Sequence, residues 1–422
     1  MHRAIFVMIA MLLCSMLSST AFAADNILIP MDRVQTDHLK AYGVVYWVLS
    51  QGFNAEWLLN YRGGSFLVPA SRLIELRCRM AGVSIEGVSA ADREAILAVI
   101  ANENMDVVLL EKAPRIAVYS PPNHNPWDDA VTLALEYAEI PHDNVWDPEI
   151  HAGALDDYDW LHLHHEDFSG QFGKFYGSFR DADWYQEQVR TYRLAARKAG
   201  FSSVQAHKGE TARLISEYVQ SGGFLFAMCS ATDTLDVALA ALGVDIVAPQ
   251  ISGTPIDPDY ARKLDFTRTM AFENFELITS PYIYEYSNID VSEYSNVSRP
   301  ELEDFVLFEF SAKFDPVETM LTQNHVNEIK GFFGQTTSFR NSVIKPGVRI
   351  LADMPGQDRS KYIHGVHGRG TFTFYGGHDP EDFTHLVGDP PTDLSLHRNS
   401  PGYRLILNNV LFPAARRQPR KT

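Results

Sequence analysis

Short apolar runs alternate with amphipathic segments along most of the chain. The runs IAVYS, WLHLH, GGFLFAMC and GTFTFY have the length and composition of buried strands. Between them, residues 127–138, 185–199 and 232–242 carry apolar side chains at helical spacing. Strands that alternate with helices indicate a parallel sheet with helices on both faces. The pattern therefore predicts an α/β fold.

The same pattern divides the chain into segments of different character. We expect an N-terminal α/β unit over residues 24–113 and a larger α/β domain over residues 114–415. Residues from about 250 to 345 are rich in Tyr, Phe, Asn and Ser and lack a regular period, which indicates a long insertion in that domain. The basic residues 416–422 predict a disordered tail.

The first 23 residues have the pattern of a bacterial export signal. His2 and Arg3 precede an apolar run over residues 4–17, which is too short to span a bilayer comfortably. Ala21 and Ala23 form an A-x-A cleavage site. We therefore expect cleavage after Ala23 and a periplasmic or secreted protein; the alternative is a membrane anchor. No later run of about twenty apolar residues occurs, so no membrane span is expected in the mature chain.

Composition and charge narrow the range of functions. The chain has 422 residues, with 53 acidic against 36 basic side chains and a formal charge of −17. An acidic surface repels phosphate backbones, so nucleic acid is not an expected partner. Three cysteines are too few for a disulfide-stapled scaffold.

A cysteine lies at the turn between a predicted strand and a predicted helix. In AMCSATDT, Cys229 follows an apolar strand, and the small residues Ala227 and Ala231 stand on either side, as a tight nucleophile elbow requires. A helix N-terminus favours a thiolate, so we expect a reactive Cys229 with a low pKa, unlike Cys78 in mid-helix. The N–H of Ser230 is placed to bind an oxyanion. The alternative is a buried structural cysteine.

A second cluster follows the last predicted strand. GTFTFYGGHDPED carries His378 just past the strand and Glu381 three residues later. A base that activates a thiol needs a group that orients its ring, and Glu381 is a candidate for that role. The alternative is a loop histidine followed by a carboxylate in the first turn of a helix. Ligands of parallel sheets bind beyond the carboxyl ends of the strands, so we expect Cys229 and His378 on neighbouring strands.

These two clusters resemble the class I glutamine amidotransferase-like superfamily. The resemblance implies a flavodoxin-like, doubly wound parallel sheet and a triad of Cys229, His378 and Glu381. The phrase GRGTFTFYGGHDPEDF is most similar to the trehalose-utilisation (ThuA-like) branch. The elbow glycines of the amidotransferases are replaced here by Ala227 and Ala231.

The whole chain also resembles a group of uncharacterised secreted bacterial proteins sometimes labelled asparagine synthetase B, through WLLNYRGGSF, LHLHHEDF and YGGHDPEDF. The residues exclude the literal activity. That enzyme uses an N-terminal cysteine, whereas this chain has His2 and an expected mature start at Ala24. Its ATP loop, S-G-G-x-D-S, is also missing, because FLFAM follows the Ser-Gly-Gly at residues 221–223.

A histidine-rich strand offers metal ligands. In WLHLHHEDF, His162 and His164 fall on one face of the predicted strand and His165 on the other. Paired with His378, His162 and His164 are candidates for a divalent metal site, although no cofactor is predicted outright. The alternative is that these histidines pack beside the site and line it.

Weaker signals concern a small-molecule or carbohydrate-like ligand. The substrate-binding candidates are His164, His165, Glu166, Asn123 and Arg180. Aromatic-rich loops that contain Phe175, Tyr176, Phe333, Gln335 and Arg340 suit a sugar or a carboxylate. His124 and Asp128 are further candidates, and Asp128 is also the expected helix cap.

Three functions follow from these residues. The first is a thiol hydrolase, similar to amidotransferases, that acts on an amide or related bond through Cys229, His378 and Glu381. The second is a non-catalytic periplasmic binding module, for example for carbohydrate. The third is a metal-dependent hydrolase that uses the histidine cluster.

Overall fold

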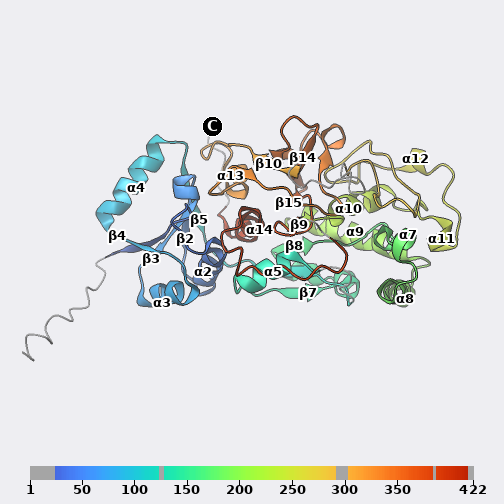
Figure 1. The fold of residues 1–422 in the computed structure, drawn as a ribbon, viewed down its shortest axis with the longest axis horizontal. Helices are drawn as coiled ribbons and strands as arrows, with labels where there is room; N and C mark the ends of the chain where they lie inside the picture. Colours follow the sequence, from blue (N-terminus) through green and yellow to red (C-terminus); the bar gives the residue numbers. More distant parts are fainter. Residues whose placement is uncertain (1–23, 123–127, 291–302, 384–385, 417–422) are drawn as a thin grey trace, which may run out of the picture.

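The computed structural model describes residues 24–122, 128–290, 303–383 and 386–416. The expected export signal and the expected basic tail beyond Arg416 lie outside the described residues. Within them the chain forms two sheets flanked by helices, which confirms the α/β class (Figure 1).

The N-terminal unit is built on a five-stranded sheet in the order β4-β1-β3-β2-β5. Its pairings are all antiparallel. A tight turn with positive φ at Asn60 and Gly64 reverses the chain between β2 and β3. The strands are β1 (Asn26–Ile29), β2 (Ala55–Leu59), β3 (Ser65–Pro69), β4 (Glu86–Val88) and β5 (Asp106–Leu110), and the helices are α2 (His38–Ser50), α3 (Arg72–Ala81) and α4 (Ala90–Asn102).

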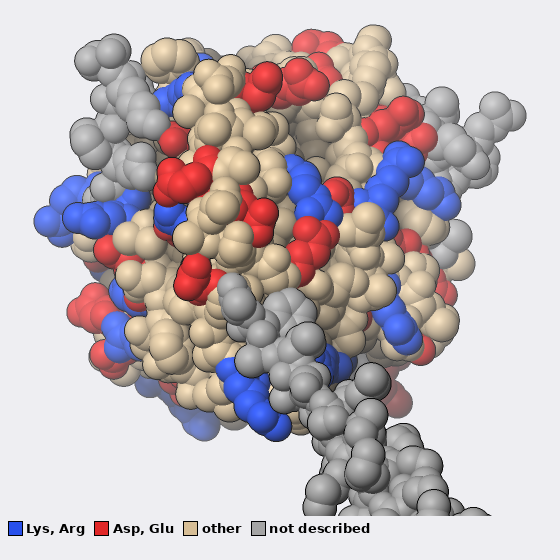
Figure 2. Space-filling view, turned by 90° about the vertical axis from the view of Figure 1, so that its left-hand side faces the viewer, with Lys and Arg blue, Asp and Glu red and all other residues tan. Residues whose placement is uncertain are grey.

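Local sequence explains where these helices begin. Asp37 accepts a hydrogen bond from the N–H of Lys40 and caps α2, and Ser71 accepts one from the N–H of Ile74 and caps α3. α4 covers one face of the sheet through Ile96 and Ile100, whereas α2 and α3 cover the other. On the face of the molecule drawn in Figure 2, Lys and Arg are interspersed with Asp and Glu. Within the N-terminal unit, Arg93 forms an ion pair with Glu56.

The second sheet has a parallel half that carries the expected strands. From one edge inward it runs β7 (Asp143–Val145), β6 (Ile116–Tyr119), β8 (Trp160–Leu163), β9 (Phe224–Met228) and β15 (Gly370–Tyr375), all parallel. Numbered along the chain, this order is 2-1-3-4-5. The short, fully buried apolar runs of β6, β8 and β9 suit strands that are covered on both faces.

The other half of this sheet is antiparallel and was not expected. β15 pairs with β14 (Arg359–His367). The next strands across the sheet are β13 (Arg349–Asp353), β10 (Phe305–Leu307) and, at the edge, β11 (Glu328–Ile329). β12 (Phe339–Arg340) pairs with β14 beside this row. The segment 250–345 therefore adds strands β10, β11 and β12 to the sheet.

Helices cover both faces of the parallel half. α9 and α10 pack on one face, and α5 and α14 pack on the other, where they also meet α2 of the N-terminal unit (Figure 1). Arg404 of α14 donates hydrogen bonds to the carbonyls of Met31 and Gly63, which ties the two sheets together. No helix in the described part of the chain is long and apolar enough to cross a membrane. The remaining helices are α5 (Ala130–Tyr137), α6 (Asp147–His151), α7 (Tyr176–Phe179), α8 (Asp183–Lys198), α9 (Val204–Gln220), α10 (Ala231–Ala240), α11 (Pro249–Ser252), α12 (Tyr260–Lys263), α13 (Pro316–Leu321) and α14 (Pro401–Leu411).

Candidate functional site

The elbow at Cys229 forms as expected. β9 ends at Met228 and α10 begins at Ala231, and Cys229 between them has a φ of 51°. A non-glycine residue in this left-handed region is strained, and such strain gathers at functional sites. The Cys229 N–H donates to the carbonyl of Gly377 at 3.1 Å, and the Ala231 N–H donates to the carbonyl of His164 at 3.0 Å. The turn is thus fastened to the segments that follow both neighbouring strands.

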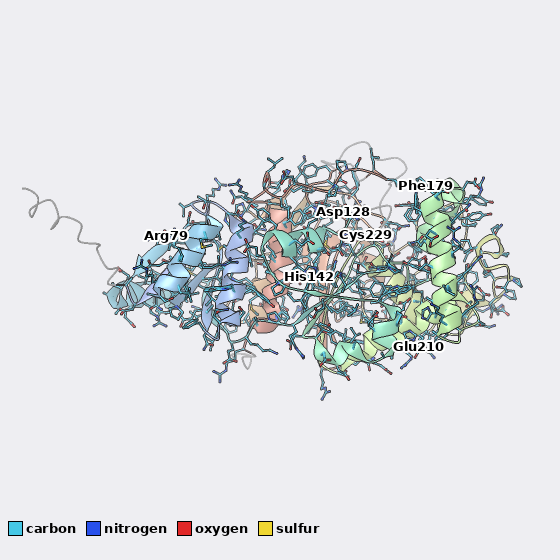
Figure 3. All side chains as sticks on the ribbon, turned by 90° about the horizontal axis from the view of Figure 1, so that it is seen from below. Arg79, Asp128, His142, Phe179, Glu210 and Cys229 are labelled. Atoms are coloured by element: carbon cyan, nitrogen blue, oxygen red, sulfur yellow. The ribbon has the colours of Figure 1, made fainter. Side chains whose placement is uncertain are left out.

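The thiol of Cys229 is fully buried near the middle of the molecule (Figure 3). Its Sγ accepts a hydrogen bond from the N–H of Gln335 at 3.3 Å, and the N–H groups of Ser230 and Thr336 also favour the thiolate. Burial outweighs these groups and raises the pKa of the thiol to about 12. The expected low pKa is therefore wrong. The N–H of Ser230, the expected oxyanion donor, faces the sulfur itself.

His378 reaches the same edge of the sheet from the neighbouring strand. β15 runs parallel to β9 with Tyr375 opposite Met228, so His378 follows three residues after the end of β15. This confirms that the strands leading to Cys229 and His378 are neighbours. The ring of His378 is buried, and its backbone N–H donates to the carbonyl of Phe333 at 2.8 Å.

The groups beside His378 differ from the expected triad. Its ring lies edge-on to that of His164, with centroids 4.4 Å apart, and stacks with His165 at 5.8 Å. The carboxylate of Glu381 lies 3.0 Å from Nδ1 of His397. The orienting role of Glu381 stays a prediction, while the contact that the structure shows for its carboxylate is with His397.

Three histidines converge at this edge. One ring nitrogen from each of His164, His165 and His378 lies within 4.8 Å of the others. The sequence placed His165 on the opposite face of the strand, which is wrong because β8 ends at Leu163 and strict alternation ends with it. The expected metal group of His162, His164 and His378 is therefore replaced by one in which His165 takes the place of His162.

His162 and His164 share a carboxylate that the sequence analysis missed. Oδ1 of Asp129 lies 3.3 Å from Nε2 of His162 and 3.3 Å from Nδ1 of His164. The same oxygen accepts hydrogen bonds from the N–H groups of Val131 and Thr132 at the start of α5. Burial alone would raise the pKa of Asp129, but the two histidines hold it well below its ordinary value.

The helix cap is thus Asp129 and not Asp128. Burial raises the pKa of Asp128, and the nearby carboxylates of Asp379 and Asp129 add to this. The sequence signal for a cap was an acidic pair before an apolar helical pattern, and either member fitted it. Only the three-dimensional course of the chain distinguishes them.

Besides His164 and His165, the other ligand-binding candidates fall into three groups. Glu166 lies at the site: its Oε2 accepts the N–H of His164 at 2.6 Å, and burial raises the pKa of its carboxyl to about 7. Arg180 is half-exposed, and its guanidinium contacts the carbonyl of Gly177, the carboxylate of Asp181 and the ring of Tyr176. Asn123 and His124 lie outside the described residues.

A strained loop and a buried segment enclose the elbow. In residues 170–174, Phe172 and Lys174 have positive φ, as do both glycines. The side-chain amide of Gln335 donates to the carbonyl of Gly173 at 2.8 Å, while its backbone N–H donates to the thiol. Gln335, a candidate from the insertion, therefore links the loop to Cys229, and the thiol is covered by chain that is distant in sequence.

A cavity of 680 Å³ lies at the other edge of the same sheet. Phe224 and Gly370, the first residues of β9 and β15, line it together with Tyr218 and Phe412. Cys229 and His378 follow the last residues of the same strands. The cavity is thus separate from the elbow, and the strained cysteine and the histidine cluster place the candidate chemistry at the carboxyl edge.

Comparisons with known proteins give only weak likenesses. No family model and no curated protein matches the chain. Among solved structures, the cytoplasmic protein STM1381 from Salmonella typhimurium LT2 is 13% identical with a TM-score of 0.36. The cytoplasmic protein STM3548 from Salmonella typhimurium is 12% identical with a TM-score of 0.35. Each alignment covers 72% of this chain and 100% of the other protein.

Proposed function

We propose that this chain is an exported thiol hydrolase, similar to class I glutamine amidotransferases, that cleaves an amide or related bond. One observation carries the proposal: Cys229 is held at a φ of 51° in a strand-to-helix elbow, and the adjacent parallel strand β15 leads to His378. A strained elbow that projects a nucleophile from the carboxyl edge of a parallel sheet is a recurring device of hydrolases.

The strand order supports the proposed superfamily. The parallel strands run 2-1-3-4-5 in chain order, which is the order of flavodoxin-like doubly wound folds. In those folds ligands bind beyond the carboxyl ends of the strands, where Cys229 and the histidines lie. The ThuA-like assignment rests on the turn after β15 and remains part of the proposal.

Because the thiol of Cys229 is neutral, the proposed reaction requires a base that removes its proton. With a pKa of about 12, Cys229 is protonated at neutral pH and needs a base, as a serine hydroxyl does. In the proposed reaction Sγ attacks the carbonyl carbon while its proton passes to His378. His378 then protonates the leaving amine, the C–N bond breaks, and a thioester remains. Water, deprotonated by His378, hydrolyses the thioester and restores the thiol.

A backbone N–H group of the elbow itself serves the same reaction. The N–H of Ser230 already favours negative charge at Sγ, so it is placed to stabilise charge that develops beside the sulfur. Because Cys229 and His378 are both buried, substrate entry requires the segment around Gln335 to move away from the sulfur.

The test is hydrolysis of a panel of chromogenic amides and esters by the purified mature protein. We expect Cys229→Ser and His378→Gln each to lower the rate by at least about 100-fold, the lower end of what a positioned base contributes. Cys78→Ser is the matched control, because Cys78 is also a free, buried cysteine but lies within α3. A Cys229→Ser protein as active as the wild type would refute the proposal.

A further inference from the structure

We infer that His164, His165 and His378 form a binding site for a divalent transition-metal ion of the zinc class. Their three ring nitrogens lie within 4.8 Å of one another. Zinc binds imidazole nitrogens at about 2.0–2.1 Å, so modest side-chain rotations bring all three onto one ion. Imidazole ligands suit zinc, copper and nickel and disfavour calcium and magnesium, which prefer oxygen.

The three rings come from two strand ends that flank the elbow. His164 and His165 follow β8, His378 follows β15, and β9 lies between these two strands. The backbone at two of these positions is fixed, because the His164 carbonyl accepts the N–H of Ala231 and the His378 N–H donates to Phe333. The backbone that carries two of the three ligands is thus held in place before any ion arrives, which limits the ordering that binding requires.

His164 shows how a metal ligand would be oriented. Its Nδ1 lies 3.3 Å from the carboxylate of Asp129, whereas its buried Nε2 has no hydrogen-bond partner in the described part of the chain. A buried ring nitrogen without a partner is costly, and a metal ion would satisfy it. A histidine that contacts a carboxylate through one nitrogen and a metal through the other is the usual arrangement around zinc.

A three-histidine set leaves a fourth position for water or substrate, as catalytic zinc sites do. The site shares His378 with the proposed thiol reaction, so a bound ion would compete with the role of this ring as base. Zinc is therefore expected to inhibit that reaction. This consequence depends on the proposed function, whereas the binding site itself does not.

The experiment is metal binding by the full mature protein after treatment with a chelator. Zinc content is measured after equilibrium dialysis, and Co²⁺ is used as a coloured substitute. We expect one ion per chain and the visible absorption of four-coordinate Co²⁺. Cys229→Ser should leave both unchanged, because the thiol is not among the ligands, and a sulfur-to-cobalt band that this substitution removes would overturn the ligand set.

Two substitutions test the ligands and the orienting carboxylate separately. His165→Gln, at the half-buried position of the cluster, should weaken zinc binding by more than about 100-fold, beyond the range of second-shell effects. Asp129→Asn keeps a good helix cap, so it should leave the fold intact and weaken binding by roughly 10–100-fold. His142→Gln is the matched control, since His142 precedes β7 and its ring contact is the carbonyl of Ile140.

The outcomes separate the two proposals. Unchanged zinc affinity in a folded His165→Gln protein, or no zinc bound by the wild type, would overturn the metal site. Zinc binding that depends on His165, together with hydrolysis that is indifferent to Cys229→Ser, would support the metal site and refute the thiol hydrolase. Far-ultraviolet circular dichroism of each variant confirms folding.

Discussion

The pH dependence of Cys229 alkylation tests whether burial or the backbone N–H groups determine the pKa of the thiol. Three backbone N–H groups favour the thiolate, but burial is the larger effect and raises the pKa to about 12. This is three pH units above the ordinary value of 9.0. Below pH 9 the thiolate fraction at Cys229 in the folded protein is therefore about a thousandfold smaller than in the unfolded chain. Full burial of Sγ slows reagent access further.

The same shift changes stability with pH in a definite direction. The folded state holds the thiol proton of Cys229 more tightly than the unfolded chain does. The contribution of this thiol to the unfolding free energy is therefore fully present below about pH 9 and is lost as the pH rises towards 12. Three pH units correspond to at most about 4 kcal/mol of unfolding free energy. Burial also raises the pKa of Cys78, to about 11. The unfolding free energy therefore also falls with rising pH through Cys78, between about pH 9 and pH 11.

Iodoacetamide labelling with mass spectrometry gives the rate at each cysteine from pH 6 to pH 10. We expect slow labelling of Cys229 in the native protein at every pH, and rapid labelling above about pH 8 once guanidinium chloride unfolds the chain. Cys78→Ser leaves Cys229 as the sole thiol of residues 24–422 and serves as the control. Faster labelling of native Cys229 than of Cys78 at pH 6 would show that the N–H groups outweigh burial, which would refute this reasoning.

Three further predictions concern export and packing. N-terminal sequencing of the protein from its native host should begin at Ala24, and an intact N-terminus in a cytosolic fraction would exclude export. Arg404→Met should lower the unfolding free energy by about 2–3 kcal/mol in urea titrations, because it leaves the buried carbonyl of Met31 and the partly buried carbonyl of Gly63 without their charged donor; an unchanged midpoint would contradict this role. Gly377→Ala should destabilise more than Gly388→Ala in thermal unfolding. Both glycines have φ near 90°, but a Cβ at Gly377 would lie 2.4 Å from the ring of Phe332, whereas a Cβ at Gly388 meets open space. Equal decreases in melting temperature would show that backbone strain, and not the contact with Phe332, determines the cost of the substitution.

Local sequence determined the parts of the site that depend on strand ends. An apolar run followed at once by a helical pattern placed Cys229 at an elbow, and another apolar run placed His378 just past a strand. Since parallel strands present their carboxyl ends at one edge, their proximity followed as well. These inferences succeeded because they use only the period of a strand and the direction of a parallel sheet.

Tertiary structure decided what surrounds those residues. Gln335, more than 100 positions from Cys229, covers the thiol, and this burial reverses the expected direction of its pKa shift. Asp129 contacts both His162 and His164, which the strand pattern did not predict, and His165 turns into the cluster because the strand ends before it. Strands β10, β11, β12 and β14 likewise depend on pairing partners rather than on their own composition. Hydrophobic period is a local property, whereas burial, ion pairing and antiparallel pairing arise from contacts between distant segments.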